Sequence, residues 1–234
     1  EREVRVMATN YGSSPIVSDG LTFAVDPQNK RSYISGSTTV TDMISGTSLS
    51  ATSVGNVPDS SYWDIDNQNR VFKKTGTDVF LSFSTQITMI GWFNRQGTGN
   101  TGRILEMYYP GANYVYGHTL ALDTDGSVRG WMDRAGDTNA RMLELSPGTT
   151  YTSGWHMLAY TYDGSDARLY VDGQQTATGA GVYGDLDDVS NIAIGGGTST
   201  YYVDAYIGPV QIYNRGLSAT EVLKNYNELK DRFE

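Results

Sequence analysis

The chain has 234 residues, a formal net charge of −9 and no cysteine, and hydrophobic residues make up 38% of it. The lack of cysteine excludes disulfides, thiolate nucleophiles and cysteine-ligated zinc. The acidic balance, with no basic stripe, is unfavourable for nucleic-acid binding, and no apolar run approaches the roughly 18 residues of a membrane span. We therefore expect neither nucleic acid nor a membrane as a partner, and the length fits one β-sandwich domain.

The first predicted element is an irregular N-terminal arm over residues 1–18, which is rich in serine. A single domain then runs from residue 19 to residue 234. The alternation of LTFAVD at residues 21–26 predicts its first strand, because side chains alternate between the two faces of a sheet. The Ser/Thr/Gly-rich zone at residues 35–61 predicts short edge strands and loops.

The middle of the chain predicts a run of antiparallel strands. ITMIGWFNR at residues 87–95 is apolar on both faces, which is typical of a strand at the centre of a covered sheet, and we expect Trp92 in the core. The strands that follow are GRILEMYY (residues 102–109), HTLALD (118–123), SVRGWMDR (127–134) and RMLEL (141–145). Turn residues between the first three favour a meander.

The stretch from Gly154 to Gln174 predicts a hairpin at the centre of the domain. Its two strands are apolar on both faces, and Asp163-Gly164 and Asp172-Gly173 lie where the chain must reverse. Met157 and Ala159 are expected on one face, with Leu158 and the neighbouring tyrosines on the other. A strand of this kind belongs in the middle of a sheet that is packed on one side and is partly covered, or used for binding, on the other.

Near the C-terminus the period changes from that of a strand to that of a helix. Ser218 stands three residues before Glu221, which is the capping-box arrangement at a helix start. Apolar residues then follow at helical spacing, at Val222, Leu223, Tyr226 and Leu229. We predict one short helix over residues 218–232, packed on the sandwich.

Four pieces in register carry a family resemblance: GWHMLAYTYDG (residues 154–164), RLYVDG (168–173), NIAIGGG (191–197) and IGPVQIYNRGLSATEV (207–222). They resemble the laminin-G-like branch of the concanavalin A-like lectin/glucanase superfamily. The resemblance implies an all-β, jelly-roll β-sandwich of two antiparallel sheets with one short C-terminal helix. It does not give the function, because this fold carries lectins, hydrolases and inert structural modules.

A second resemblance concerns the setting. The segment DGLTFAVDPQNKRSY at residues 19–33 resembles the opening of laminin-G-like domains in tail, fibre and head-surface proteins of bacteriophages. It implies a location in the virion, with other virion proteins or a host surface glycan as partners. By analogy with fibres, it also implies a homo-oligomer such as a trimer.

We predict no catalytic residues. Glycosidases of this fold use two carboxylates across the scissile bond, set on one strand as E-x-D-x-E or a similar motif. Of the glutamates, only Glu106 and Glu144 lie inside the predicted sandwich, and neither has an acidic neighbour two residues away. We expect His156 to help packing and hydrogen bonding, and no nucleophile elbow of the G-x-S-x-G type is present.

Tyrosines are the predicted ligand contacts. A tyrosine ring offers a flat apolar face and a hydroxyl at little cost in entropy, so exposed clusters favour recognition. The alternative is that these rings fill positions within strands. The candidate residues come from two loops, with one histidine beside the first: Tyr108, Tyr109, Tyr114, Tyr116, His118, Tyr201 and Tyr202.

Calcium is the cofactor that the resemblance suggests, since relatives hold it with carboxylate and carbonyl oxygens. Gly208 stands where those relatives carry an aspartate before the last strand. The remaining candidate is the acidic loop with Asp185, Asp187, Asp188 and Asn191. Crowded carboxylates repel one another unless they are solvated or a cation neutralises them, so a solvated acidic surface is the alternative.

The sequence therefore predicts a non-enzymatic structural or decoration protein of a bacteriophage particle, which works by attachment. The alternative is a secreted carbohydrate-binding module or a cell-surface adhesin. A glycoside hydrolase is a more distant alternative. The three differ in whether the free protein binds a glycan and in whether it releases sugar.

Overall fold

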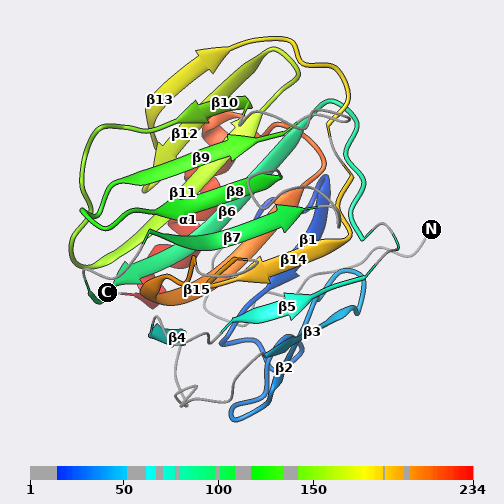
Figure 1. Cartoon of the computed structure of the whole chain (residues 1–234), viewed down its shortest axis with the longest axis vertical. Coiled ribbons are helices and arrows are strands. Elements are labelled where there is room, and N and C mark those ends of the chain that lie inside the picture. Colours follow the sequence, from blue (N-terminus) through cyan, green and yellow to red (C-terminus); the bar gives the residue numbers. More distant parts are fainter. Residues whose placement is uncertain are drawn as a thin grey trace.

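The protein is described here from a computed structural model over residues 15–51, 62–66, 71–76, 78, 80–97, 101–108, 117–133, 142–186, 188–197 and 201–233. In these ranges the chain forms two antiparallel sheets packed face to face, with a short helix behind one of them (Figure 1). This is the predicted all-β sandwich with a C-terminal helix. No helix in the described ranges is long and apolar enough to cross a membrane.

The sheet next to the helix is called sheet A. Its strands are β1 (Leu21–Val25), β4 (Trp63–Asp66), β6 (Ile87–Arg95), β11 (Trp155–Tyr162), β12 (Asp166–Val171), β13 (Gln174–Ala180) and β15 (Asp204–Tyr213). They lie in the order β1-β15-β6-β11-β12-β13, and β4 also pairs with β15. The predicted central strands, β6 and β11, are neighbours in the middle of the sheet.

The opposite sheet is called sheet B. Its strands are β2 (Thr39–Thr41), β3 (Ser48–Ala51), β5 (Phe72–Lys74), β7 (Gly102–Tyr108), β8 (His118–Leu122), β9 (Val128–Met132), β10 (Met142–Leu145) and β14 (Asn191–Ile194). They lie in the order β10-β9-β8-β7-β14-β5-β3-β2. The predicted meander is therefore confirmed as β7-β8-β9, which are three neighbouring strands of this eight-stranded sheet.

The main core lies between the two sheets, and a second apolar layer lies on the outer face of sheet A. On β11, Leu158, Tyr160 and Tyr162 belong to the main core, whereas Met157 and Ala159 belong to the second layer. All five are fully buried. The predicted central strand is confirmed, and its outer face is covered at Met157 and Ala159.

The turn between β12 and β13 depends on its two central residues. Asp172 and Gly173 both have positive φ, at 52° and 75°, which is the requirement of the two-residue turn that matches the twist of paired strands. A Cβ on Gly173 would also lie 2.8 Å from a side-chain carbon of Leu223 on the helix. Glycine therefore serves both the turn and the close approach of the helix.

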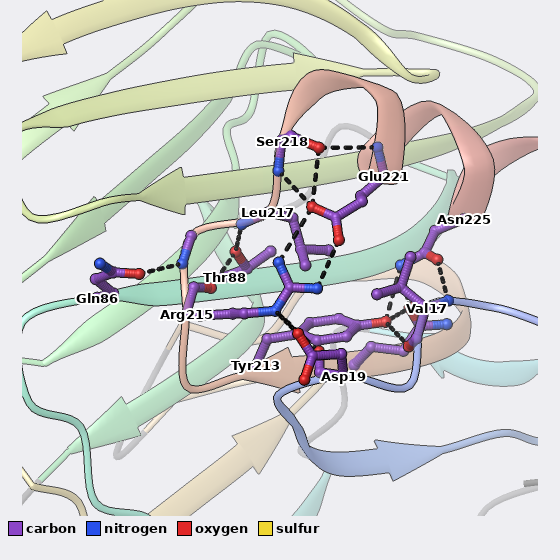
Figure 2. Close-up of polar contacts among 12 residues, drawn as sticks. Val17, Asp19, Gln86, Thr88, Tyr213, Arg215, Leu217, Ser218, Glu221 and Asn225 are labelled. Atoms are coloured by element: carbon purple, nitrogen blue, oxygen red, sulfur yellow. Dashed lines mark hydrogen bonds and ion pairs between the residues drawn. The ribbon is translucent and has the colours of Figure 1, made fainter. Parts of the chain in front are cut away.

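The helix α1 (Ala219–Leu229) continues into a 3-10 turn, η1 (Lys230–Arg232). The Ser218 side chain accepts a hydrogen bond from the Glu221 amide, and the Glu221 carboxylate accepts one from the Ser218 amide, so the predicted capping box is present. Arg215 adds a bidentate pair to the same carboxylate, at 3.1 and 2.6 Å (Figure 2). The start of the helix is thus fixed to the end of β15.

A buried polar network locks the helix to the segment before β1. The side chain of Asn225 accepts from the Val17 amide at 2.8 Å and donates to the Tyr213 hydroxyl at 2.8 Å (Figure 2). The Tyr213 hydroxyl in turn donates to the Val17 carbonyl at 3.0 Å. Burial raises the pKa of Tyr213, so this hydroxyl keeps its proton. Val17, within the predicted arm, therefore packs on the domain.

Candidate functional site

The outer face of sheet B differs from that of sheet A because it carries charges and aromatic rings. Leu105 and Met107 of β7 face the main core, so Glu106 between them points outward. The strand pairing places Glu106 level with Lys73 and Trp131 through the small residues Ala193 and Thr119. One row of outward side chains therefore crosses β5, β14, β7, β8 and β9.

Arg103 lies at the centre of this face. Its guanidinium stands 4.7 Å from the ring centre of Trp131 and 4.4 Å from that of Tyr201. Arginine suits such a position because its planar cation is weakly hydrated and stacks on rings. The side chain is 2% exposed, so the cation is held almost fully out of water between the two aromatic residues.

Two further charges lie beside Arg103. A carboxylate oxygen of Glu106 is 3.5 Å from its Nε, and this glutamate is also buried. The Nζ of Lys73 lies 6.0 Å from the ring centre of Tyr202. Burial lowers the pKa of Lys73, against the opposing effect of the charge on Glu106. Removing a charged group from water costs free energy unless the charge is paired. Buried charged groups of this kind are frequent at functional sites.

Backbone contacts fix the two tyrosines that cover this face. The Arg103 amide donates to the Tyr201 carbonyl at 3.0 Å, and the Val203 amide donates to the Gly195 carbonyl at 3.1 Å. The segment runs so close to β7 that a Cβ on Gly102 would lie 2.3 Å from the Cα of Val203. Tyr201 and Tyr202 are both half-buried. They are therefore held in place while each residue stays partly exposed.

The glycine run after β14 makes room for this arrangement. Gly195 has a φ of 84°, a region that favours glycine. A Cβ on Gly196 would lie 2.8 Å from the ring of Tyr202, and one on Gly197 would lie 2.8 Å from a carboxylate oxygen of Glu106. The run is a loop, and larger residues in it would displace the site residues.

Arg129 forms the rim of the same face, on β9 next to Trp131. Its guanidinium donates to Asp123 at 2.6 Å and to Glu144 at 2.7 Å. Burial lowers the pKa of Arg129, but the two carboxylates outweigh this and raise it. Of the two interior glutamates, Glu106 thus faces Arg103 and Glu144 faces Arg129.

The predicted ligand contacts have different places in the structure. Tyr201 and Tyr202 lie together on the face described above, and half-buried Tyr108 ends β7 on the same side as Glu106. His118 is fully buried; it faces Phe83 of the main core and accepts from the Asp133 amide at 3.3 Å. The remaining three of these residues, Tyr109, Tyr114 and Tyr116, lie outside the described residues.

The acidic loop uses several of its oxygens within the fold. Asp188 accepts from the Ser82 hydroxyl at 2.7 Å and from the Phe83 amide at 3.1 Å, and Asn191 accepts from the Gly76 amide at 2.9 Å. Asp185 is exposed, and Asp187 lies outside the described residues. No group of three or more metal-binding side chains occurs in the described part of the chain. Calcium at this loop stays a prediction.

Three residues of the face, Arg103, Trp131 and Lys73, were missed by the sequence reasoning. Alternation on the separate strands contains part of the signal, since arginine and tryptophan in SVRGW stand at outward positions. It does not show that Trp131 of β9 and Tyr201 both lie against the guanidinium of Arg103 on β7. Arg103 also lies next to a register shift between Arg103 and Leu105, which breaks simple alternation.

Comparison with family models gives one clear match. Residues 66–223, more than half of the chain, match the laminin-G-like model described as the concanavalin A-like lectin/glucanases superfamily. This agrees with the sandwich architecture and with the pieces that carry the sequence resemblance. No curated protein matched in a sequence search.

Solved structures with the same fold include two kinds of protein. A sialidase of Trypanosoma rangeli has 16% identity and a TM-score of 0.65, with 91% of this chain and 33% of that chain covered. The binding domain of Paraclostridial Mosquitocidal Protein 1 has 17% identity and a TM-score of 0.63, with 89% and 52% covered.

The binding domain of Botulinum Neurotoxin DC, solved in complex with SialylT, is also similar. It has 11% identity and a TM-score of 0.64, with 90% of this chain and 51% of that chain covered. The chain thus spans about a third of the sialidase and about half of each toxin binding domain. At these identities the likeness concerns the fold.

Proposed function

The chain belongs to the concanavalin A-like lectin/glucanase superfamily, and from this premise we propose that it is a non-catalytic module that binds a glycan through the outer face of sheet B. The observation that carries the proposal is Arg103, held between Trp131 and Tyr201 with Tyr202 alongside. Glycan sites combine ring faces, which stack on sugars, with a few fixed polar groups, which hold hydroxyls or a carboxylate.

The two outer faces of the sandwich support this choice of face. Sheet A is covered on its outer side by α1, and the layer between them is apolar and buried. Sheet B has no helix on its outer side within the described ranges. Partly exposed Tyr201 and Tyr202 therefore lie where a ligand can reach them.

Binding fits the carboxylates better than hydrolysis does. Most glycosidases need a protonated carboxylic acid next to the glycosidic oxygen and a second carboxylate across the bond. Glu106 and Glu144 instead lie against the guanidinium groups of Arg103 and Arg129, so each is paired with a cation of the protein itself. We propose that these glutamates hold the arginines in place.

The sialidases and the toxin binding domain solved with SialylT suggest sialylated glycans as the first probes. The test is an array of sialylated and neutral glycans, followed by titration of each hit with the purified protein. We expect Tyr202→Ala to weaken binding about fivefold to tenfold, and Tyr202→Phe to keep most of it because the ring remains.

Two results would overturn the proposal. One is an array without hits for the wild-type protein, and the other is equal affinity of the wild type and Tyr202→Ala. The unfolding temperature of each variant, measured in parallel, separates a lost contact from a lost fold. Release of reducing sugar that is abolished in Glu106→Gln would replace the proposal with hydrolysis.

The setting that we propose is the surface of a bacteriophage particle, where attachment to a host glycan would be useful. It rests on the resemblance of the segment at residues 19–33. Copies of the protein bound to particles, seen by electron microscopy, would support this setting. Secretion of the free protein by a bacterium would favour the alternative of a carbohydrate-binding module or adhesin.

A further inference from the structure

A second group of partly exposed aromatic residues lies on the outer face of sheet A, beyond the end of the helix. Strand pairing places Asp64 of β4 opposite Tyr206 of β15, Tyr206 opposite Asn94 of β6, and Asn94 opposite Trp155 of β11. Directly paired residues of antiparallel strands point to the same side. The four side chains therefore form one row across four neighbouring strands, and all four are half-buried.

Two more rings extend this row. Tyr62 stacks on Tyr206 with ring centres 4.2 Å apart and lies 5.7 Å from the ring of Trp155. Phe233, after η1, stacks on the other side of Trp155 at 4.4 Å. Together with the strand residues they form a continuous surface, here called the aromatic row: Tyr62, Asp64, Asn94, Trp155, Tyr206 and Phe233.

Gly208 provides the floor beneath one end of the aromatic row. A Cβ at this position would lie 2.9 Å from the Cβ of Trp92, 3.1 Å from the Phe233 ring and 3.4 Å from the Trp155 ring. Glycine therefore lets both outer rings rest directly on the sheet. Gly208 stands where related proteins carry a metal-binding aspartate, and here it allows the rings of Trp155 and Phe233 to pack on the sheet.

Aromatic rings and polar side chains alternate along the row, and this pattern indicates the kind of ligand that fits it. Tyr206 and Trp155 are two strand spacings apart, roughly 10 Å, with the Asn94 amide between them and the Asp64 carboxylate beyond. Rings receive the apolar faces of sugars, and an amide and a carboxylate receive their hydroxyls. The spacing suits a chain of sugars better than a single ring.

The carboxylates in and beside the aromatic row favour a neutral ligand. Asp64 lies within the row, and Asp204 precedes Tyr206 by two residues on the same strand, whereas the charged neighbours of the Tyr201 face include Arg103 and Lys73. A carboxylate in the row repels acidic sugars. A protein partner would need roughly 20–30 residues on each side, whereas the aromatic row has six.

We propose that the aromatic row is a second glycan-binding site, which takes a neutral oligosaccharide and is independent of the Tyr201 face. The ligand lies along the row, with sugar rings on Tyr206 and Trp155 and hydroxyls on Asn94 and Asp64. The two sites then lie on opposite outer faces of the sandwich, so one molecule could hold two glycans at once.

The test is titration of the purified protein with neutral hexasaccharides of glucose, mannose and galactose, followed by tryptophan fluorescence and by calorimetry. We expect Tyr206→Ala and Asn94→Ala each to weaken binding about fivefold to tenfold, and Tyr206→Phe to bind nearly as well as the wild type. Tyr202→Ala, on the other face, should leave this affinity unchanged, which separates the two proposals.

Two outcomes would overturn the inference. One is that no neutral hexasaccharide binds at a ligand concentration of about 10 mM, which would detect even weak binding. The other is equal affinity of the wild type, Tyr206→Ala and Asn94→Ala. Sedimentation that shows a dimer lost in Tyr206→Ala would identify the row as a contact between copies instead. Asn94→Ala removes no ring, so it keeps the test decisive if Tyr206→Ala fails to fold.

Discussion

The buried polar groups on the outer faces of the two sheets have different surroundings. On sheet A, beneath the helix, the buried polar groups of Asn225, Tyr213 and the Val17 backbone bond to one another. On sheet B, Arg103 and Glu106 are just as buried, but half-exposed tyrosines cover them. Beneath the helix, sheet A is closed by its own chain, whereas sheet B presents charges and rings at the surface.

The difference shows what an inert face requires. Where the helix packs, apolar side chains fill the layer and each polar atom of the network serves a contact within the fold. A face that only needed to be soluble would carry solvated side chains, not a cation between two rings. The comparison can therefore be tested by removing the polar groups of each face in turn.

The largest expected effect is on sheet B. Replacing Arg103 by Met leaves the buried Glu106 without this partner, which should lower the free energy of unfolding by about 3 kcal/mol. The double variant Arg103→Met/Glu106→Gln should recover part of this loss, because the uncompensated charge is gone. Denaturant unfolding followed by tryptophan fluorescence measures both. A double variant no more stable than the single one would show that the pair does not act as a unit.

The next effect is on sheet A. Asn225→Ala removes the acceptor of the Val17 amide and a donor to Tyr213, so we expect a loss of about 2–3 kcal/mol in the free energy of unfolding. Asn227→Ala is the matched control, since Asn227 is exposed on the same helix. Glycan binding should be unchanged in both variants. A weaker affinity in Asn225→Ala at a temperature where it is folded would contradict the separation of the two faces.

The sequence predicts sheet A better than sheet B. The capping box of Ser218 and Glu221, the apolar faces of β6 and β11, and the turn at Asp172-Gly173 are local patterns, and all are confirmed. Asn225 lies within the helical stripe, three residues after Val222, but an asparagine is not counted in an apolar pattern. Its role depends on Val17, 208 residues away, and no local pattern contains that information.

The site on sheet B depends on contacts between segments far apart in sequence. Tyr201 and Tyr202 could be predicted because a pair of loop tyrosines is unusual on its own. Arg103 and Trp131 become partners only through the order of strands β7, β8 and β9. The register shift beside Arg103 also turns its side chain to the same side as Glu106, which strict alternation does not predict.

A smaller effect is expected at the helix start, where pH is the variable. The hydrogen bond from Arg215, helped by Ser218, lowers the pKa of Glu221 to about 2. Because the folded value lies below the ordinary one, this carboxylate stabilises the protein above about pH 4.5, and the contribution is lost as the pH falls towards 2. We expect about 1–2 kcal/mol, since the group is partly solvated.

Glu221→Gln tests this through the unfolding temperature between pH 2 and pH 6. The variant should be less stable than the wild type near pH 6, and the two should converge as the pH falls. Asp231→Asn, at an exposed residue of η1, should keep the wild-type profile. A constant difference between Glu221→Gln and the wild type across this range would show that ionisation is not the cause.

The smallest effect concerns His156, near the start of the central strand β11. Its Nδ1 lies 2.7 Å from an Asp172 carboxylate oxygen and its Nε2 lies 3.1 Å from the Ser153 carbonyl, so both nitrogens face acceptors and the imidazolium satisfies both. Burial lowers the pKa of His156, but Asp172 and the carbonyl outweigh it and raise the value. The stabilisation is therefore complete below about pH 6.5 and is lost as the pH rises through the folded value.

We expect the wild type to lose roughly 1–3 °C of unfolding temperature through this histidine as the pH rises above 6.5, because a partly exposed pair contributes at most about 1 kcal/mol. His156→Gln should remove this pH dependence without changing the glycan affinity of either proposed site. Asp172 also accepts from the Met157 amide at 2.9 Å, so Asp172→Asn should lose the pH dependence and some stability besides. If His156→Gln kept the wild-type dependence of unfolding temperature on pH, a group other than His156 would have to bind the proton.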